Sequence, residues 1–145
     1  MNENAFWDTA RHSSSPLVAT HSNAHTLCPQ PRNLTDHQLL AIRDSGGVAG
    51  VNFGNAFLRA DGKRDSDTPL STIVRHIDYL INIMGDDHVA LGSDFDGITL
   101  PDDLRDVSGL PRLISALRDS GYDQFVLNKL LWGNWQKVLQ NVWQQ

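Results

Sequence analysis

Three short apolar runs in this chain each end in polar side chains. The runs lead into Thr20-His21-Ser22, into Asn52, and into Ser93-Asp94-Phe95-Asp96. Continuous apolar runs of this length are typical of strands that are buried on both faces of a parallel sheet. In parallel α/β architectures, the carboxyl ends of such strands are where active sites are built. The pattern therefore predicts three buried strands that end in groups able to bind or react.

Helical spacing fills the stretches between these strands. Thr35 and Gln38 form a capping-box pattern, which predicts a helix that ends at Ser45-Gly46-Gly47. Apolar residues from Leu70 to Met84 recur every three or four positions and predict a second helix. We expect further helices over residues 4–14, 110–120 and 123–143, the last bent or divided at Gly133-Asn134, and a loop over residues 54–68.

Strands that alternate with helices indicate an α/β fold, with parallel pairing through right-handed crossovers. A closed eight-stranded (β/α)8 barrel of the TIM type needs about 250 residues. The 145 residues are enough for part of one. We therefore expect residues 1–145 to form a single partial domain, an incomplete barrel with about three parallel strands.

Composition narrows the classes of function. A net charge of −5 gives no electrostatic reason to expect a nucleic-acid partner. No apolar run approaches the length of a membrane span, and the first residues do not have the pattern of a signal peptide. The single cysteine, Cys28, has no internal partner for a disulfide. We expect a cytoplasmic protein with no membrane partner.

Three residues at predicted strand ends and one arginine in the loop after the first strand are candidates for chemistry. His21 could bind a metal, act as a base or hydrogen-bond a neighbouring loop. Asp94 and Asp96 would share a face on a regular strand, where they could bind a cation or transfer a proton; the alternative is a loop that caps the next helix. Arg32 could hold a substrate carboxylate with two hydrogen bonds, or be an ordinary surface arginine.

One motif is set aside on its context. His76-Ile77-Asp78 has the His-x-Asp spacing of binuclear metal hydrolases, but it falls inside the periodic helix over 70–84. Residues two apart in a helix point to different sides. We expect Ile77 to be buried, and His76 and Asp78 to lie on or near the polar flanks of that helix.

Several blocks together resemble a known family. In order along the chain, the blocks are Thr20-His21-Ser22-Asn23-Ala24, Pro31-Arg32-Asn33-Leu34-Thr35-Asp36, Gly46-Gly47-Val48 with Val51-Asn52-Phe53, His76-Ile77-Asp78, and Leu91-Gly92-Ser93-Asp94-Phe95-Asp96-Gly97. They resemble the C-terminal part of the membrane (renal-type) dipeptidase family, and its bacterial members most of all. Asp106-Val107-Ser108 and Gly133-Asn134 are similar to it as well.

The resemblance implies a fold, an activity and site residues. It implies the C-terminal segment of a metallo-dependent hydrolase barrel of the (β/α)8 type, in which two zinc ions and a bridging water hydrolyse dipeptides. By the matching motifs, His21 corresponds to a zinc-binding histidine and Arg32 to the arginine that binds the terminal carboxylate of the substrate. Asp94 corresponds to the catalytic acid that handles proton transfer beside the metals.

The same resemblance implies that ligands are missing. The family's early strands supply a His-x-Asp pair, a bridging glutamate and another histidine, and no stretch of this sequence matches them. Since a zinc site needs three or four protein ligands, we expect the isolated chain to lose the zinc ions and to be inactive as a dipeptidase. A truncated gene product, a mis-called start and an expressed fragment all stay open.

Two other readings of the chain stay open too. It could be a non-catalytic binding or assembly module that keeps the Arg32 pocket, or the C-terminal half of a split dipeptidase that a separate N-terminal polypeptide completes. Three parallel strands leave two open sheet edges, and such edges invite pairing. We therefore expect the open edges to be covered by a second copy of the chain in a homo-oligomer or by a separate N-terminal half. The alternative is a rearranged sheet.

Overall fold

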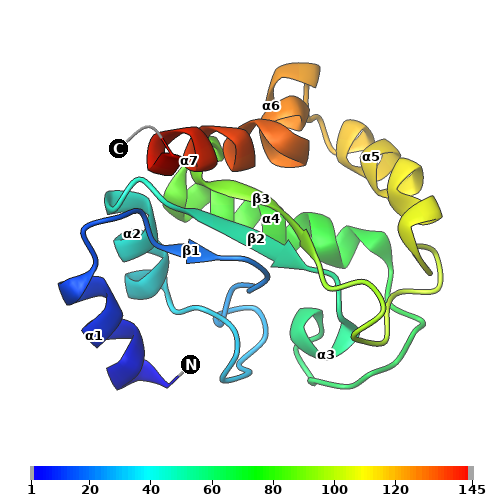
Figure 1. The fold of residues 1–145 in the computed structure, drawn as a ribbon. Coiled ribbons are helices and arrows are strands. Elements are labelled where there is room, and N and C mark those ends of the chain that lie inside the picture. Colours follow the sequence, from blue (N-terminus) through cyan, green and yellow to red (C-terminus); the bar gives the residue numbers. More distant parts are fainter. Residues whose placement is uncertain (1, 144–145) are drawn as a thin grey trace.

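The computed structural model describes residues 2–143 and contains one three-stranded parallel sheet (Figure 1). The strands lie side by side in sequence order, as β1 (Val18–Ala19), β2 (Val48–Asn52) and β3 (Val89–Ser93). Helices connect them, so the α/β fold predicted from the sequence is confirmed. A register shift next to Asn52 pairs that residue with Ser93.

Helices surround this sheet and form the rest of the fold. They are α1 (Glu3–His12), α2 (Asp36–Asp44), α3 (Asn55–Leu58), α4 (Leu70–Met84), α5 (Leu110–Asp119), α6 (Gln124–Asn128) and α7 (Asn134–Trp143). A π-helical turn, η3 (Lys129–Gly133), separates α6 from α7, as the Gly133-Asn134 break predicts. Two 3-10 turns, η1 (Asp86–His88) and η2 (Val107–Gly109), flank β3 and α5. The short helix α3 lies where the sequence predicted only a loop.

Local signals in the sequence set the ends of two helices. The Thr35 side chain accepts a hydrogen bond from the backbone of Gln38, and the Gln38 side chain accepts one from the backbone of Thr35, so the capping box at α2 is formed. Helix α4 begins after Pro69 and ends at Gly85, whose φ of 81° favours glycine.

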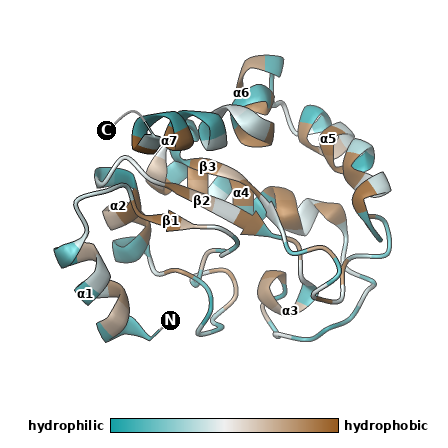
Figure 2. Cartoon of the chain, viewed as in Figure 1, coloured by the Kyte–Doolittle hydropathy of each residue, from teal (hydrophilic) through white to brown (hydrophobic). Residues whose placement is uncertain are grey.

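The apolar side chains of the sheet divide between its two faces. Ala49, Val51 and Val89 lie in the main core with the buried faces of α2 and α4. Val48 and Ala90, which point the other way, pack with Val138 and Trp135 of α7. Figure 2 shows apolar colour along the strands and on several turns of α4. Both faces of β2 are therefore covered, and all five of its residues are buried.

Two elements are shorter than the sequence pattern predicts. β1 has two residues and pairs with β2 alone within the described part of the chain, and Val18 at this edge is 45% exposed. β3 ends at Ser93, so the prediction that Asp94 and Asp96 share one face of a regular strand is wrong. Both aspartates have positive φ, 72° and 65°, which turns the chain out of the strand. Among the helices of residues 2–143, none has the length and apolar character of a membrane span.

Candidate active site

The carboxyl ends of the three strands meet at one edge of the sheet. The Ser22 backbone N–H, after β1, donates to Gly50 O in β2 at 2.7 Å. The Phe53 N–H, after β2, donates to Ser93 O in β3 at 3.0 Å. These backbone bonds bring the segments after β1, β2 and β3 together, so the polar residues that follow each strand share one surface.

His21 follows β1 and has a partner at each ring nitrogen. Its Nδ1 lies 2.6 Å from the Thr20 hydroxyl, and its Nε2 contacts the Arg32 guanidinium. A guanidinium can only donate, so Nε2 accepts and the proton of a neutral ring is assigned to Nδ1. His21 is thus held between a hydroxyl and a cation.

Arg32 lies in the loop between β1 and α2 and reaches back to the strand ends. Its guanidinium carbon is 5.6 Å from the centre of the Phe57 ring, within the range of a cation–π contact. Within residues 2–143, no carboxylate is close enough to pair with it. The result is a planar cation, oriented by an imidazole and an aromatic ring, with hydrogen-bonding capacity left for an anion.

Asp94 is held by a buried amide. The Asn52 Nδ2 donates to Asp94 Oδ2 at 2.9 Å, while Asn52 Oδ1 accepts from the Gly54 N–H at 2.7 Å. Because the second bond fixes which end of the amide is the oxygen, the NH2 group must face the aspartate. Asp94 lies in the left-handed region together with its neighbour Ser93, whose φ is 41°. Such a conformation costs about 1–3 kcal/mol for a residue other than glycine, and the Asn52 bond helps to hold it.

A second buried amide fixes Asn52 itself. Asn23 accepts the Asn52 backbone N–H at 2.9 Å and donates to the Asn52 carbonyl at 2.9 Å and to the Phe57 carbonyl at 3.1 Å. Asn33 donates to the Phe57 carbonyl and to the Cys28 carbonyl, each at 2.9 Å. These two amides tie the loop that carries Arg32 to the ends of β2 and α3.

Two glycines allow β1 to approach the other strands closely. A Cβ at Gly50 or at Gly92 would lie 2.2 Å from the Thr20 carbonyl oxygen, well inside van der Waals contact. This close approach is possible only because neither residue has a side chain. It sets the position of Thr20, and therefore the direction from which His21 leaves the strand.

His76 departs from its expected position on the flank of α4. It is fully buried, where its Nδ1 accepts the Ala24 N–H at 3.3 Å and its Nε2 donates to the Leu58 carbonyl at 2.9 Å. Burial lowers the pKa of His76 to about 4, so the ring is neutral. It joins α4 to the loops after β1 and β2. Helical periodicity missed this because both of its partners lie in distant loops.

Three of these side chains, those of Arg32, Phe57 and Asp94, line an open cleft of about 630 Å³. It is lined by Arg32, Phe57, Arg64, Asp94, Asp96, Gly97, Ile98 and Thr99. His21 lines a neighbouring cavity of about 420 Å³ beside α1, and Arg32 borders both. The structure thus brings Arg32 and Asp94 into one cleft, and connects His21 to it through the guanidinium.

The described residues do not fit a zinc pair. Within residues 2–143, no group of three or more His, Cys, Asp or Glu side chains is arranged to hold a metal. A histidine ligand needs a free ring nitrogen, but both nitrogens of His21 have protein partners, one of them a cation. A catalytic zinc needs three protein ligands. Within residues 2–143, the cleft therefore offers a guanidinium, Arg32, and a carboxylate, Asp94, without a complete set of metal ligands.

The sequence placed Asn52 at a strand end, as it did His21, but did not single out Phe57 or Arg64, which line the cleft. Phe57 and Arg64 had no such signal, because they lie in a stretch that the sequence presents only as a polar loop. Phe57 lies on the short helix α3 and Arg64 in the loop after it, and both line the cleft.

The fold and the cleft define the class: a parallel α/β segment with its polar groups at the carboxyl ends of the strands. The family model of the membrane dipeptidases, peptidase family M19, matches residues 1–145. The chain belongs to this family. The resemblance inferred from the strand-end motifs is thus confirmed.

Several relatives and solved structures are similar to this chain. It is 84% identical over its full length to the pqqA 5′-region protein of Klebsiella pneumoniae and spans 54% of it. It is 36% identical over 133 residues to Dipeptidase ataJ of Aspergillus terreus, spanning 32% of that protein. A metallopeptidase from Rhodobacter sphaeroides, liganded with a phosphinate mimic of the dipeptide L-Ala-D-Ala, is 51% identical with a TM-score of 0.95. The match covers 97% of this chain and 40% of that one.

The dipeptidase AC, a family M19 metallopeptidase, is likewise 51% identical, with a TM-score of 0.95. The match covers 97% of this chain and 41% of the dipeptidase chain. These structural neighbours are of the TIM-barrel type, so the three parallel strands are part of such a barrel. The expected fold class, part of a (β/α)8 barrel, is confirmed.

Proposed function

We propose that this chain carries the substrate-binding and proton-transfer part of a dipeptidase site. The observation that supports this is the cleft in which Arg32, a guanidinium with no carboxylate partner within residues 2–143, and Asp94, an oriented carboxylate, lie together at the strand ends. The substrate is a dipeptide, and the reaction is hydrolysis of its peptide bond. The relatives that carry the name dipeptidase support the same assignment.

Arg32 is proposed to bind the terminal carboxylate of the dipeptide. Guanidinium groups match a carboxylate with two parallel hydrogen bonds. The contacts with His21 and Phe57 hold the plane of the guanidinium before substrate arrives, which lowers the entropic cost of binding. Removing Arg32 should therefore weaken binding.

Asp94 is proposed to move the proton during hydrolysis. The Asn52 bond occupies Oδ2, and within residues 2–143 no hydrogen bond engages Oδ1 of this cleft-lining residue. General acid–base groups contribute roughly 10²–10⁴-fold to the rate. Removing Asp94 should therefore lower kcat.

His21 is proposed as a zinc ligand of the intact family site, where its ring would release the Arg32 contact to bind the metal and two zinc ions would supply the activated water. In these 145 residues it stands alone, so we propose that the chain by itself retains no zinc and does not hydrolyse dipeptides. The remaining ligands would come from additional polypeptide, either in the same chain or in a partner. A cytoplasmic location is also proposed, because a single cysteine cannot form an internal disulfide and so gives no sign of an oxidising compartment.

Restoring the rest of the barrel tests the proposal. The chain would be fused to, or co-expressed with, the N-terminal segment of the Klebsiella pneumoniae relative, and dipeptide hydrolysis followed with zinc present. We expect the restored enzyme to hydrolyse dipeptides and to lose this activity when zinc is chelated. The 145-residue chain alone should be no faster than its His21→Ala variant. In the restored enzyme, Arg32→Ala should raise KM, because losing one partner of a desolvated charge pair costs about 2–5 kcal/mol. Asp94→Asn should lower kcat instead.

The outcomes separate the open alternatives. A restored protein that binds dipeptides but turns none over would favour a non-catalytic binding module. Activity on simple co-expression of the two segments would favour a split enzyme. An unchanged KM in Arg32→Ala together with an unchanged kcat in Asp94→Asn would contradict both residue assignments.

A further inference from the structure

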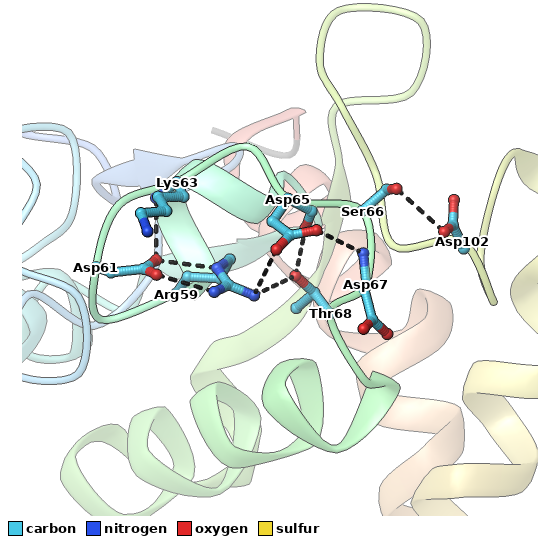
Figure 3. Close-up of polar contacts among 8 residues, drawn as sticks. All are labelled: Arg59, Asp61, Lys63, Asp65, Ser66, Asp67, Thr68 and Asp102. Carbon is cyan, nitrogen blue, oxygen red and sulfur yellow. Dashed lines mark hydrogen bonds and ion pairs between the residues drawn. The ribbon is translucent and has the colours of Figure 1, made fainter.

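The loop after α3 forms one wall of the cleft, and polar contacts hold it in shape (Figure 3). Arg59 donates twice to Asp61, from Nε to Oδ1 at 2.9 Å and from Nη2 to Oδ2 at 2.8 Å. The Asp61 carboxylate also accepts the Lys63 N–H at 3.1 Å. The Arg59 guanidinium beside Asp61 lowers the pKa of that carboxyl, which therefore stays ionised in neutral solution.

The same loop is fastened at its far end to the loop that follows β3. The Ser66 hydroxyl donates to Asp102 Oδ2 at 3.0 Å, and the Asp102 N–H donates to Ser66 O at 2.9 Å. Thr68, at the base of the loop, is buried and donates to the Asp65 carbonyl at 2.6 Å. Two loops that follow different strands thus form one continuous rim (Figure 3).

Arg64 lies within this rim and lines the cleft. The adjacent carboxylate, Asp65, has other partners: it accepts the Asp67 N–H at 3.1 Å and lies 3.9 Å from the Arg59 guanidinium. Within residues 2–143, no carboxylate pairs with Arg64, although Asp96 lines the same cleft. The cleft therefore contains two guanidiniums without a carboxylate partner, Arg32 and Arg64.

We propose that Arg64 is a specificity residue that selects ligands with a second carboxylate. This inference rests on the proposed function: Arg32 binds the main-chain carboxylate of a dipeptide, and Arg64 binds the side chain of an aspartate or glutamate within it. The cleft, at about 630 Å³, is within the usual range for small-molecule sites. A carboxylate receives charge-assisted hydrogen bonds from Arg64 that a neutral amide of the same shape does not.

Binding to the chain itself gives the direct test. Succinate, with two carboxylates, and succinamate, with one carboxylate and one amide, would be titrated into the 145-residue protein and followed by NMR at the Arg32 and Arg64 side chains. We expect succinate to bind about tenfold more tightly, the size of effect that one added charge-assisted bond produces. Arg64→Gln should abolish this preference. Lys63→Gln, which removes a charge from the same loop outside the cleft lining, should retain it. Equal affinity of the unmodified protein for both ligands would overturn the proposal.

Kinetics in the restored enzyme separate this inference from the proposed function. Dipeptides that end in aspartate and in asparagine would be compared for the parent, Arg64→Gln and Lys63→Gln. We expect Arg64→Gln alone to raise KM for the aspartyl substrate about tenfold and to leave the asparaginyl substrate unchanged. If Arg64→Gln hydrolyses both substrates and the ratio of their KM values equals that of the parent, the role of Arg64 is contradicted and the dipeptidase proposal stays intact. Hydrolysis of neither would contradict the dipeptidase proposal, while the succinate titration would still decide the role of Arg64.

Discussion

The packed side of the sheet and the rim at its carboxyl end are built in opposite ways. Against the sheet, α4 contributes a continuous stripe of buried apolar residues such as Ile73, Ile77 and Leu80. At the rim, buried amides, positive φ values and ion pairs position the chain. Substitution in the packed side should therefore cost stability. Substitution at the rim should change binding while the fold is retained.

Truncation in the packed side should give the largest loss of stability. Leu80 is fully buried, so Leu80→Ala removes apolar contacts and leaves a cavity that costs about 2–5 kcal/mol. Urea denaturation followed by circular dichroism measures this loss. Asn82→Ala, an exposed change on the same helix, is the matched control, and its free energy of unfolding should be close to that of the parent. Equal stability of the two variants would break the comparison.

Acid should weaken the join between the packed side and the rim. The pKa of His76 is about 4 in the folded protein and 6.5 ordinarily, because burial disfavours the charged ring. The unfolded chain therefore binds the proton first. Stability should be constant above about pH 6.5 and fall as the pH drops toward 4, by about 3 kcal/mol in all from this group.

Variants assign that loss to His76. His76→Gln should flatten the unfolding free energy between pH 6.5 and 4, whereas His37→Gln, at an exposed position, should follow the parent curve. Equal pH slopes in all three proteins would show that the loss arises from other groups.

Removing the amide that holds Asp94 should have a moderate effect on stability and a selective effect on the site. Asn52→Ala loses the bonds to Asp94 and Gly54 and leaves buried partners unsatisfied, which costs about 1–3 kcal/mol. In the restored enzyme we expect kcat to fall and KM for the dipeptide to stay near the parent value. A matched change at buried Asn55, whose side chain has no hydrogen-bond partner within residues 2–143, should leave kcat unchanged. A fall in kcat of the same size in Asn55→Ala would indicate a general loss of packing.

The smallest effect is expected at the open edge of the sheet. Val18 of β1 is 45% exposed, and Trp132 and Trp143 near the carboxyl end are 56% and 76% exposed. Exposed edges and apolar side chains favour association, so light scattering should detect a homodimer or larger species as concentration rises. Val18→Lys should weaken that association without a change in the unfolding midpoint at low concentration. A strict monomer at all concentrations would contradict the expectation.

The sequence predicted best what is decided locally. The capping box at Thr35 and the spacing within α4 depend on residues three or four positions apart, and both helices lie where expected. Each predicted strand is also present, because continuous apolar runs mark buried strands, although β1 has only two residues. The apolar runs also predicted where the polar residues at the strand ends would lie.

The sequence predicted poorly what depends on distant partners. The burial of His76 is set by Ala24 and Leu58, which are far from it in the chain. Arg64 reaches the cleft through the Arg59–Asp61 pair and the Ser66–Asp102 contact, and no periodic pattern encodes either. The left-handed turn at Asp94 broke the expected alternation of a strand. Tertiary contacts decided all three.

The close approach of Thr20 to Gly50 and Gly92 has a consequence for how copies of this gene diverge. Any side chain at either glycine collides with backbone, so these positions are barred to substitution in every copy that still folds, whether or not it retains activity. Asp94 and Arg64 are under no such steric constraint. A descendant that has lost its chemistry would keep both glycines and drift at the two charged residues. Natural variation at these four positions therefore distinguishes selection for the fold from selection for the site.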